Sequence, residues 1–161
     1  MYDIPILFVI FKRKEVTLRS LAQIRKARPT KLYIAGDGPR AEVAGEADMV
    51  EATRKAVIEA IDWECDVHTN FQTCNLGCGH GVYTAINWLF ANEKRGIIIE
   101  DDCVMRDSFF PFVKELLERY ADDMRVGMVC GANYADNCEV PDSYVFSRYK
   151  SCHGWATWRR A

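Results

Sequence analysis

Three acidic side chains follow directly on the all-aliphatic run Ile97–Ile99 and form the clearest chemical feature of the sequence. Glu100, Asp101 and Asp102 repel one another unless a cation or hydrogen-bond donors compensate their charge. Carboxylates without neighbouring histidines suit a hard divalent ion, Mn²⁺ or Mg²⁺, whereas the thiol of the adjacent Cys103 is a poor ligand for either ion. The three acids therefore predict metal or ligand binding, and the alternative is a solvated turn with helix-capping acids.

Basic and turn residues follow two other apolar runs. Lys12, Arg13 and Lys14 come at the end of the run Ile4–Phe11 and could hold phosphate, because Arg offers a bidentate fork and Lys a point charge. The alternative for them is a solvated positive turn. Asp37, between two glycines, could accept hydrogen bonds from a base or ribose, or could simply shape its turn.

A glycine-rich segment, residues 77–81, opens a predicted helix, and its backbone N–H groups could bind an anion. It matches no complete Walker A or dinucleotide fingerprint. Cys74, Cys78 and His80 raise the question of zinc, but their spacing is not a usual zinc pattern and no fourth ligand is obvious. Near the end, residues 154–158 could form an aromatic wall for a sugar, or place a Trp in the core.

Short apolar runs alternate with amphipathic stretches, which predicts an α/β fold with a mostly parallel sheet covered on both faces. The expected strands are 4–11, 32–35, 65–68, 97–99, 126–130 and a short one near 144–146. The expected helices are 16–27, 47–61, 82–90 and 109–120, the last capped by Ser108 or Asp107. In such sheets ligands bind at the carboxyl ends of the strands. We therefore expect residues 11–14, 36–40 and 100–102 to converge at one edge.

The composition is that of one soluble globular domain of 161 residues, with 49% hydrophobic and 27% charged residues. With a net charge of −2, the chain does not have the excess of basic residues that is typical of a nucleic-acid binder. No apolar run approaches the ~20 residues of a membrane span. The N-terminal stretch has no small-residue cleavage site, so no signal peptide is expected. Seven cysteines are an odd number for a disulfide framework; small apolar side chains in a reducing cytosol explain most of them, and we expect a cytoplasmic protein.

Taken in order, these motifs resemble the GT-A class of nucleotide-sugar glycosyltransferases over essentially the whole chain. The segments that carry the resemblance are Phe11-Lys-Arg, Asp37, Asn75-Leu-Gly-Cys-Gly, Gly96–Cys103, Phe146-Ser-Arg-Tyr149 and Gly154–Arg160. The chain is most similar to a bacterial group of nucleotide-diphospho-sugar transferases, some labelled hemolysin-A-like. It is more distantly similar to N-acetylglucosaminyltransferase I, which carries a Glu-Asp-Asp version of the Asp-X-Asp motif. The resemblance implies a GT-A, Rossmann-like fold, with one nucleotide-sugar-binding domain over residues 1–161.

The resemblance also implies roles for the acidic residues. Asp102 would bind the Mn²⁺ or Mg²⁺ that bridges the diphosphate. Asp101 would contact the ribose or donor sugar, and Glu100 the donor sugar or its surroundings.

On the nucleotide side, the resemblance implies that Phe11, Lys12 and Arg13 meet the nucleotide and that Asp37 contacts the uracil of a UDP-sugar. His80 would lie at the phosphate or base region. The bacterial group often has Lys at that position, so this basic contact would be weakened or pH-dependent.

The implied reaction is glycosyl transfer, in which an acceptor hydroxyl attacks the anomeric carbon while the metal neutralises the leaving diphosphate. The acceptor would be a glycan or lipid-linked glycan in cell-surface polysaccharide synthesis, compatible with peripheral membrane association. Gly154 and Trp155 are the acceptor-side candidates. In the N-acetylglucosaminyltransferase likeness the catalytic base follows the Gly-Trp segment. We therefore expect the base to lie beyond Ala161, and the chain to be a truncated piece that binds a donor but transfers sugar poorly.

Two other function classes fit parts of the sequence. A sugar-phosphate nucleotidyltransferase shares the sheet and acidic metal site but normally has a glycine-rich loop after its first strand, and residues 11–15 contain no glycine. A non-catalytic nucleotide-sugar-binding or structural module would use the acids only to cap a turn. Loss of metal-dependent ligand binding in Asp102→Ala would separate this last class from the two enzymes.

Overall fold

The computed structural model of the chain describes residues 1–132 and 142–161. Within them, six strands form one sheet in the order β3-β2-β1-β4-β6-β5. The strands are β1 Ile6–Ile10, β2 Lys31–Gly36, β3 Asp66–Phe71, β4 Arg95–Glu100, β5 Val129–Cys130 and β6 Trp155–Trp158. The helices are α1 Lys14–Ala27, α2 Glu46–Glu59, α3 Cys78–Asn92 and α4 Phe109–Arg119. Strands β1 to β4 pair in parallel and β6 runs antiparallel to β4 and β5, so the predicted mostly parallel α/β fold is confirmed.

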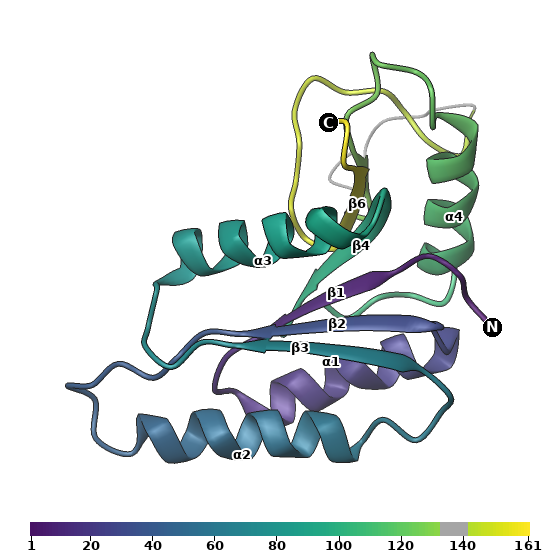
Figure 1. Cartoon of the computed structure of the whole chain (residues 1–161). Helices are drawn as coiled ribbons and strands as arrows, with labels where there is room; N and C mark the ends of the chain where they lie inside the picture. The colour runs from purple at the N-terminus through teal and green to yellow at the C-terminus, as the bar shows by residue number, and fades with distance from the viewer. Residues whose placement is uncertain (133–141) are drawn as a thin grey trace.

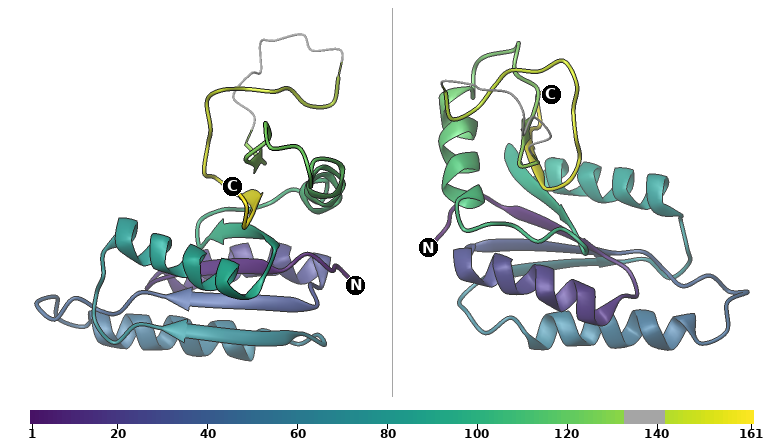
Figure 2. Two further views of the ribbon diagram at one scale, coloured as in Figure 1. Left: turned by 45° about the horizontal axis from the view of Figure 1, so that its top comes forward. Right: turned by 180° about the vertical axis from the view of Figure 1, so that it is seen from behind.

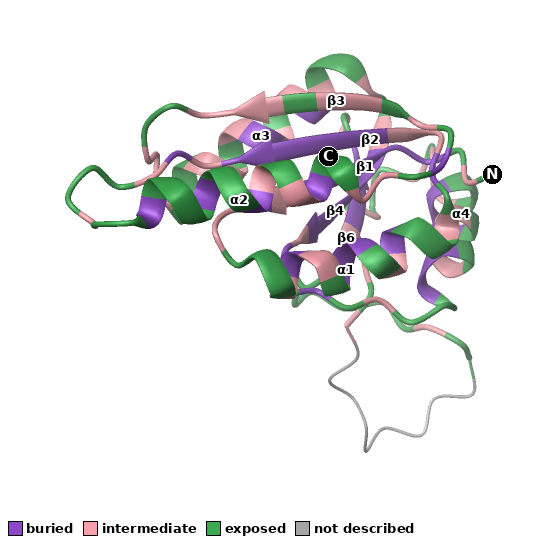
Figure 3. Cartoon of the chain, turned by 90° about the horizontal axis from the view of Figure 1, so that it is seen from below, coloured by how far each residue is buried: buried purple, intermediate pink, exposed green. Residues whose placement is uncertain are grey.

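Helices cover both faces of the sheet (Figures 1 and 2). Successive strand side chains point to opposite faces, so β1 contributes to two cores. Ile6, Phe8 and Ile10 join the core shared with α1, α2 and α4, whereas Leu7 joins the smaller core beneath α3. β1 and β2 lie in the middle of this arrangement and are buried along most of their length (Figure 3). β1, β2 and β4 are thus held firmly by burial, whereas β3 at the edge of the sheet is only partly buried.

The predicted start of the helix after the glycine-rich segment and the predicted side-chain cap of α4 differ from the structure. Helix α3 begins at Cys78 rather than near Val82, so the loop before it ends at Gly77, whose φ of +81° suits glycine. Ser108 does precede α4, but its side chain makes no capping hydrogen bond. Position alone was therefore a poor guide to capping here.

The strand predicted near residues 144–146 is wrong. These residues form no strand; instead the rings of Tyr144 and Phe146 lie edge-on to Tyr120, with centroids 6.3 and 5.5 Å away. The aromatic and β-branched composition that indicated a strand reflects packing against the end of α4. β6 occupies the place beside β4 in the sheet.

The cysteine prediction holds only in part. Cys103 is buried, as a small apolar side chain should be, but Cys74, Cys78 and Cys152 are exposed, so burial does not explain them. All six cysteines in the described residues are free, and Cys138 lies outside those residues. No helix in the described part of the chain is both long and apolar enough to cross a membrane.

Candidate functional site

The three acidic residues lie at the carboxyl edge of the sheet, where Arg13 meets them. β1 and β4 are parallel neighbours with Val9 opposite Glu100, so the residues after each strand emerge side by side. Arg13 Nη2 lies 2.5 Å from Asp101 Oδ1 and 3.0 Å from Asp102 Oδ2. These hydrogen bonds raise the pKa of the Arg13 guanidinium. Residues 88 positions apart in the chain are thus brought together, as the strand-end rule predicted.

Glu100, Asp101 and Asp102 differ in their surroundings. Asp101 is buried against Arg13, whereas the Asp102 side chain is 53% exposed. Burial raises the pKa of Glu100, and the nearby charges of Asp102 and Asp101 raise it further. A cation placed among these carboxylates would relieve that repulsion. We refer below to Arg13 and these three acids as the acidic corner.

The donor chemistry of Asp102 fits a hard divalent ion. One of its oxygens is bonded to Arg13, and the other, Oδ1, has the weakly donating Cys103 thiol at 3.9 Å as its hydrogen-bond contact among residues 1–132 and 142–161. In the described residues no three His, Cys, Asp or Glu side chains group closely enough to form a complete cage for a metal. This arrangement of the described residues includes no such group built on Cys74, Cys78 and His80. It is compatible with an ion held by one carboxylate, waters and substrate phosphates, as Mg²⁺ commonly is.

A buried carboxylate, Glu46, lies behind the basic residues of the same edge. Its side chain is fully buried at the start of α2 and accepts hydrogen bonds from Lys12 Nζ at 2.5 Å and Arg40 Nη2 at 2.5 Å. These partners lower the pKa of Glu46. Lys12 is therefore held in place rather than solvated freely. Sequence analysis missed Glu46 and Arg40, because an acid on an amphipathic helix normally faces water.

The Asp37 carboxylate is engaged in a network of its own. Oδ1 accepts from the backbone N–H groups of Gly38 and Leu76, and Oδ2 accepts from the Gly77 N–H and the Asn75 side-chain amide, all at 2.8–3.0 Å. Of the segment 77–81, whose N–H groups we expected to bind an external anion, the Gly77 N–H binds this carboxylate instead. A side chain at Gly38 would come within 2.4 Å of the Cys74 backbone, so the contact requires glycine.

Arg54, on α2, reinforces the same turn. Its Nη2 donates to the carbonyl oxygens of Asp37 at 3.0 Å and of Gln72 at 2.8 Å, and its guanidinium lies 4.8 Å from the centre of the Phe71 ring. Burial lowers its pKa. The ends of β2 and β3 are therefore tied together by a side chain that the sequence patterns did not single out.

The remaining predicted site residues are more dispersed. Phe11 is half-buried, with the Lys12 ammonium 5.5 Å from its ring. His80 is exposed in the first turn of α3 and makes no hydrogen bond or ion pair with the acidic corner in the described structure. Gly154 is buried at a φ of +67°, and Trp155 is half-buried in β6 opposite Ile98. Its neighbour Trp158 is in the core, donating from Nε1 to the Leu117 carbonyl at 3.1 Å, which confirms the core alternative for that Trp.

A cavity of about 810 Å³ opens beside Asp102. Apolar side chains of Met105, Phe109 and Phe112 line it, and the polar side chains of Ser143 and His153 lie at its wall. His153 Nδ1 is 2.8 Å from the Ser151 hydroxyl. Sequence analysis missed these residues, since the apolar ones follow an ordinary amphipathic helix pattern. The cavity has the mixed polar and apolar character that small-molecule sites share.

The chain is similar to known proteins in fold rather than in sequence. No protein-family profile and no curated protein matches the chain. A solved structure with a similar fold is the mannosyltransferase PcManGT from Pyrobaculum calidifontis, in complex with GDP-mannose and Mn²⁺, with a TM-score of 0.50 and 16% identity. The match covers 80% of this chain and 36% of that one. At this identity the match shows the fold alone: the chain shares an α/β architecture with part of that mannosyltransferase.

Proposed function

We propose that this chain is a metal-dependent glycosyltransferase domain that takes a sugar from a nucleotide-diphospho-sugar. The observation that carries the proposal is the acidic corner, where Arg13 after β1 meets Asp101 and the half-exposed Asp102 after β4. The glycosyltransferase-like fold supports it, since ligands of such sheets bind at this edge. The motif resemblance to bacterial nucleotide-diphospho-sugar transferases and, more distantly, to N-acetylglucosaminyltransferase I agrees with it.

In this proposal, Asp102 holds Mn²⁺ or Mg²⁺, and the ion supplies charge neutralisation for the leaving diphosphate. Arg13 fixes the orientation of Asp101 and Asp102, and Lys12, held by Glu46, contributes positive charge on the nucleotide side. Asp101 and Glu100 face the ribose and donor sugar. We assign no catalytic base among the described residues.

Binding measurements with both UDP-sugars and GDP-sugars test most directly which nucleotide the donor carries. The motif resemblance favours UDP, whereas the structural neighbour PcManGT has GDP-mannose bound. The four hydrogen bonds at the Asp37 carboxylate would compete with a contact to uracil. We therefore propose that Asp37 shapes the wall of the base site through the loop at 75–77, and that His80 lies at its rim.

The cavity beside Asp102 is the proposed place for the acceptor. Its aromatic floor offers faces on which a sugar can stack, and Gly154 lies next to its Met105 wall, where an added Cβ would approach the Met105 sulfur to 2.6 Å. Trp155 follows as the first residue of β6. The acceptor class we propose is a glycan or lipid-linked glycan of cell-surface polysaccharide synthesis, used in the cytoplasm.

The sugar-phosphate nucleotidyltransferase alternative is disfavoured by the connection between β1 and α1. Only Phe11, Lys12 and Arg13 lie between the two elements, and none is a glycine. A backbone cradle for a triphosphate normally needs glycines for close approach.

The decisive experiment is a thermal-shift and calorimetric titration with UDP-glucose, UDP-N-acetylglucosamine and GDP-mannose, each with Mn²⁺ and with EDTA. A ligand that binds only the folded state raises the midpoint by mass action. We expect at least one nucleotide sugar to raise it with Mn²⁺ and not with EDTA. Absence of any nucleotide-sugar binding would refute the proposal, and stabilisation by a nucleoside triphosphate with a sugar phosphate instead would favour the nucleotidyltransferase.

A further inference from the structure

Large apolar side chains are exposed together at the carboxyl end of α4. The yellow-green segment passes over this end in Figure 1. In that segment Val145 is 53%, Phe146 69% and Tyr149 93% exposed, and Met124 in the turn after α4 is 70% exposed. Single exposed apolar residues are ordinary, but several on one segment mark an interaction site. We call residues 144–150 the aromatic-basic segment.

The exposed Phe146 is held by a set of packed rings. Its centroid lies 5.5 Å from Tyr120 and 5.8 Å from Tyr144, and Tyr144 lies 6.4 Å from Phe112 on α4. The hydroxyl oxygens of Tyr120 and Tyr144 are 2.6 Å apart. Edge-to-face contacts of this kind fix ring orientations. Phe146 is thus presented outward on a structured base rather than on a loosely attached loop.

The end of α4 beneath these rings is itself anchored. Arg160 donates to the carbonyl oxygens of Tyr120 and Ala121, each at 2.8 Å, and to that of Val126 at 3.1 Å. These bonds tie Arg160 to the C-cap of α4 and to the turn that follows it. The aromatic-basic segment therefore rests on a rigid support.

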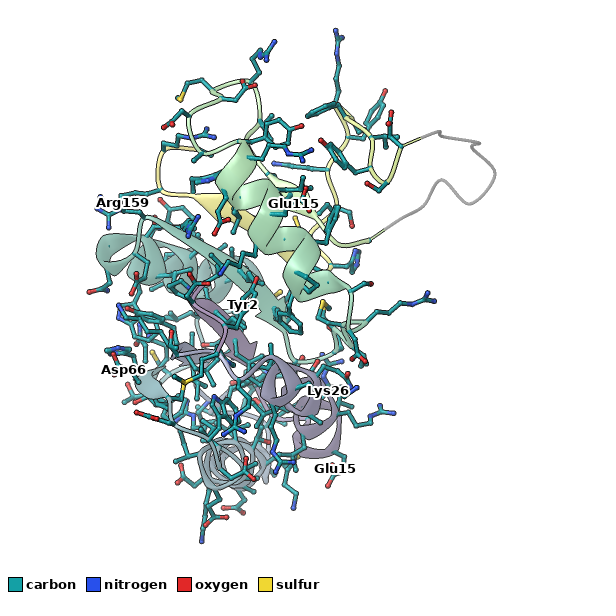
Figure 4. The ribbon with its side chains drawn as sticks, turned by 90° about the vertical axis from the view of Figure 1, so that its right-hand side faces the viewer. Tyr2, Glu15, Lys26, Asp66, Glu115 and Arg159 are labelled. Carbon is teal, nitrogen blue, oxygen red and sulfur yellow. The ribbon has the colours of Figure 1, made fainter. Side chains whose placement is uncertain are left out.

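The charge of this region differs from that of the whole chain. Residues 143–161 contain four Lys or Arg and no Asp or Glu, so they carry +4 in a chain of net charge −2. Arg148 and Lys150 alternate with the exposed apolar residues of the segment and are themselves exposed. Acids lie near this surface as well. Glu115 on α4 (Figure 4) is paired with Arg119 at 2.9 Å, and Asp123 in the turn after α4 is paired with Arg125 at 2.7 Å, whereas Asp122 in that turn and Asp142 before the segment are exposed.

We propose that the aromatic-basic segment binds the surface of an anionic lipid bilayer. Aromatic side chains favour the level of the lipid headgroups, where their apolar rings leave water, and Lys and Arg are attracted to anionic headgroups. A glycan is the less favoured occupant. Residues 143–150 contain no Asp, Glu, Asn or Gln side chain to bind sugar hydroxyls.

Binding in this way would place the cavity beside Asp102 near the bilayer. Ser143, next to the segment, and Phe112, on which Tyr144 packs, both line that cavity. An acceptor carried on a lipid could then reach the acidic corner. This consequence rests on the proposed function, whereas membrane binding itself does not.

The test is flotation of the full chain with vesicles of phosphatidylcholine alone and of phosphatidylcholine with 30% phosphatidylserine, in EDTA so that no metal bridges protein and lipid. We expect at least tenfold tighter binding to the anionic vesicles, weakened by high salt. The double variant Phe146→Ser/Tyr149→Ser should lose binding, and Arg148→Ser/Lys150→Ser should lose the preference for anionic lipid. The matched control Ile58→Ser/Lys55→Ser, on the exposed side of α2, should bind like the parent chain.

Several results would overturn the inference. These are no binding to anionic vesicles, equal binding by the segment variants and the control, or a concentration-dependent dimer that Phe146→Ser disrupts. Soluble oligosaccharide binding lost in Phe146→Ser/Tyr149→Ser, without vesicle binding, would assign the surface to glycans instead. Metal-dependent nucleotide-sugar binding, measured on the same variants, reports on the proposed function separately and should be unchanged by them.

Discussion

Two aspartates lie at similar positions on the carboxyl edge of the sheet, Asp37 after β2 and Asp102 after β4. They differ in how far their carboxylates are hydrogen-bonded within the protein. The Asp37 carboxylate accepts four hydrogen bonds within the protein, from a turn and a loop that it joins. Asp102 makes one ion pair through one oxygen and is half exposed. A carboxylate whose lone pairs are fully used stabilises the fold, whereas one left partly unused can exchange its partner for a ligand.

The same contrast extends to their basic neighbours. Arg54 points its donors at backbone carbonyls at the ends of β2 and β3, so it acts as a brace. The Arg13 guanidinium donates to the side chains of Asp101 and Asp102, and the Arg13 side chain is 49% exposed. The β2–β3 end is therefore a framework, and the acidic corner is where charge is available for chemistry. Three substitutions test this division.

The largest effect is expected for Asp102→Asn. Losing the anionic ligand should weaken Mn²⁺-dependent nucleotide-sugar binding by roughly 100-fold, about 2.7 kcal/mol, with little change in the unfolding midpoint. Isothermal titration calorimetry measures the first quantity and thermal denaturation the second. Asp107→Asn, an exposed acid in the same loop, is the matched control and should bind normally. Undiminished binding in Asp102→Asn would remove this residue from the site.

For Asp37→Ala we expect a stability effect instead. Removing a carboxylate that joins a turn to the loop at 75–77 leaves several backbone donors without their acceptor, which should lower the free energy of unfolding by about 2 kcal/mol. Urea denaturation measures this change. Asp122→Ala, at an exposed turn position, should change stability by less than about 0.5 kcal/mol. If Asp37→Ala folds as stably as the parent but loses nucleotide binding, the framework assignment is wrong.

The smallest effect concerns Glu100, and it depends on pH. Burial raises its pKa in the folded state above the ordinary 4.5, so between these two values the folded protein holds more protons than the unfolded chain. Stability from this group is therefore present below pH 4.5 and is lost as pH rises through the raised folded pKa. Glu100→Gln has no carboxyl group to ionise, so it avoids this loss of stability. It should therefore be more stable than the parent chain at pH 7 by up to about 1 kcal/mol.

Urea denaturation of Glu100→Gln and the parent chain at pH 4 and pH 7 measures that difference. The two proteins should differ least at the lower pH. A Glu100→Gln variant that is less stable than the parent at pH 7, or a difference that does not depend on pH, would contradict the electrostatic description of the acidic corner.

Local patterns predicted most of the elements that position this edge. The buried run at 97–99, followed at once by three acids, indicated both a central strand and a polar site at its end, because an abrupt change from aliphatic to charged residues is typical of a buried strand that emerges at a polar edge. The runs ending near Phe11 and Ala35 predicted β1 and β2 in the same way. The strand expected near 144–146 failed because aromatic residues gather as readily against a helix as in a sheet.

The spacing of residues in the sequence could predict neither the hydrogen-bond partners of the polar side chains nor the cavity beside Asp102. Whether Asp37 turns to a ligand or to the loop at 75–77 depends on how closely Gly38 lets the Cys74 backbone approach. Glu46 could only be recognised as a buried partner of Lys12 and Arg40 once α2 was packed behind their loops. These are contacts between segments far apart in the chain, and no periodicity records them.

The sequence by itself determined an alternating α/β sheet with an acidic cluster at the end of a central strand, since burial periodicity and the position of charges are local properties. Only the tertiary structure decided that Arg13 compensates Asp101 and Asp102, that Asp37 is internally satisfied, and that Phe146 is exposed on packed rings. The physical reason is that a polar group finds a hydrogen-bond partner, and a side chain is exposed or covered, only through the segment that packs against it. The partner and the exposure are fixed only when the parallel strands bring distant segments together.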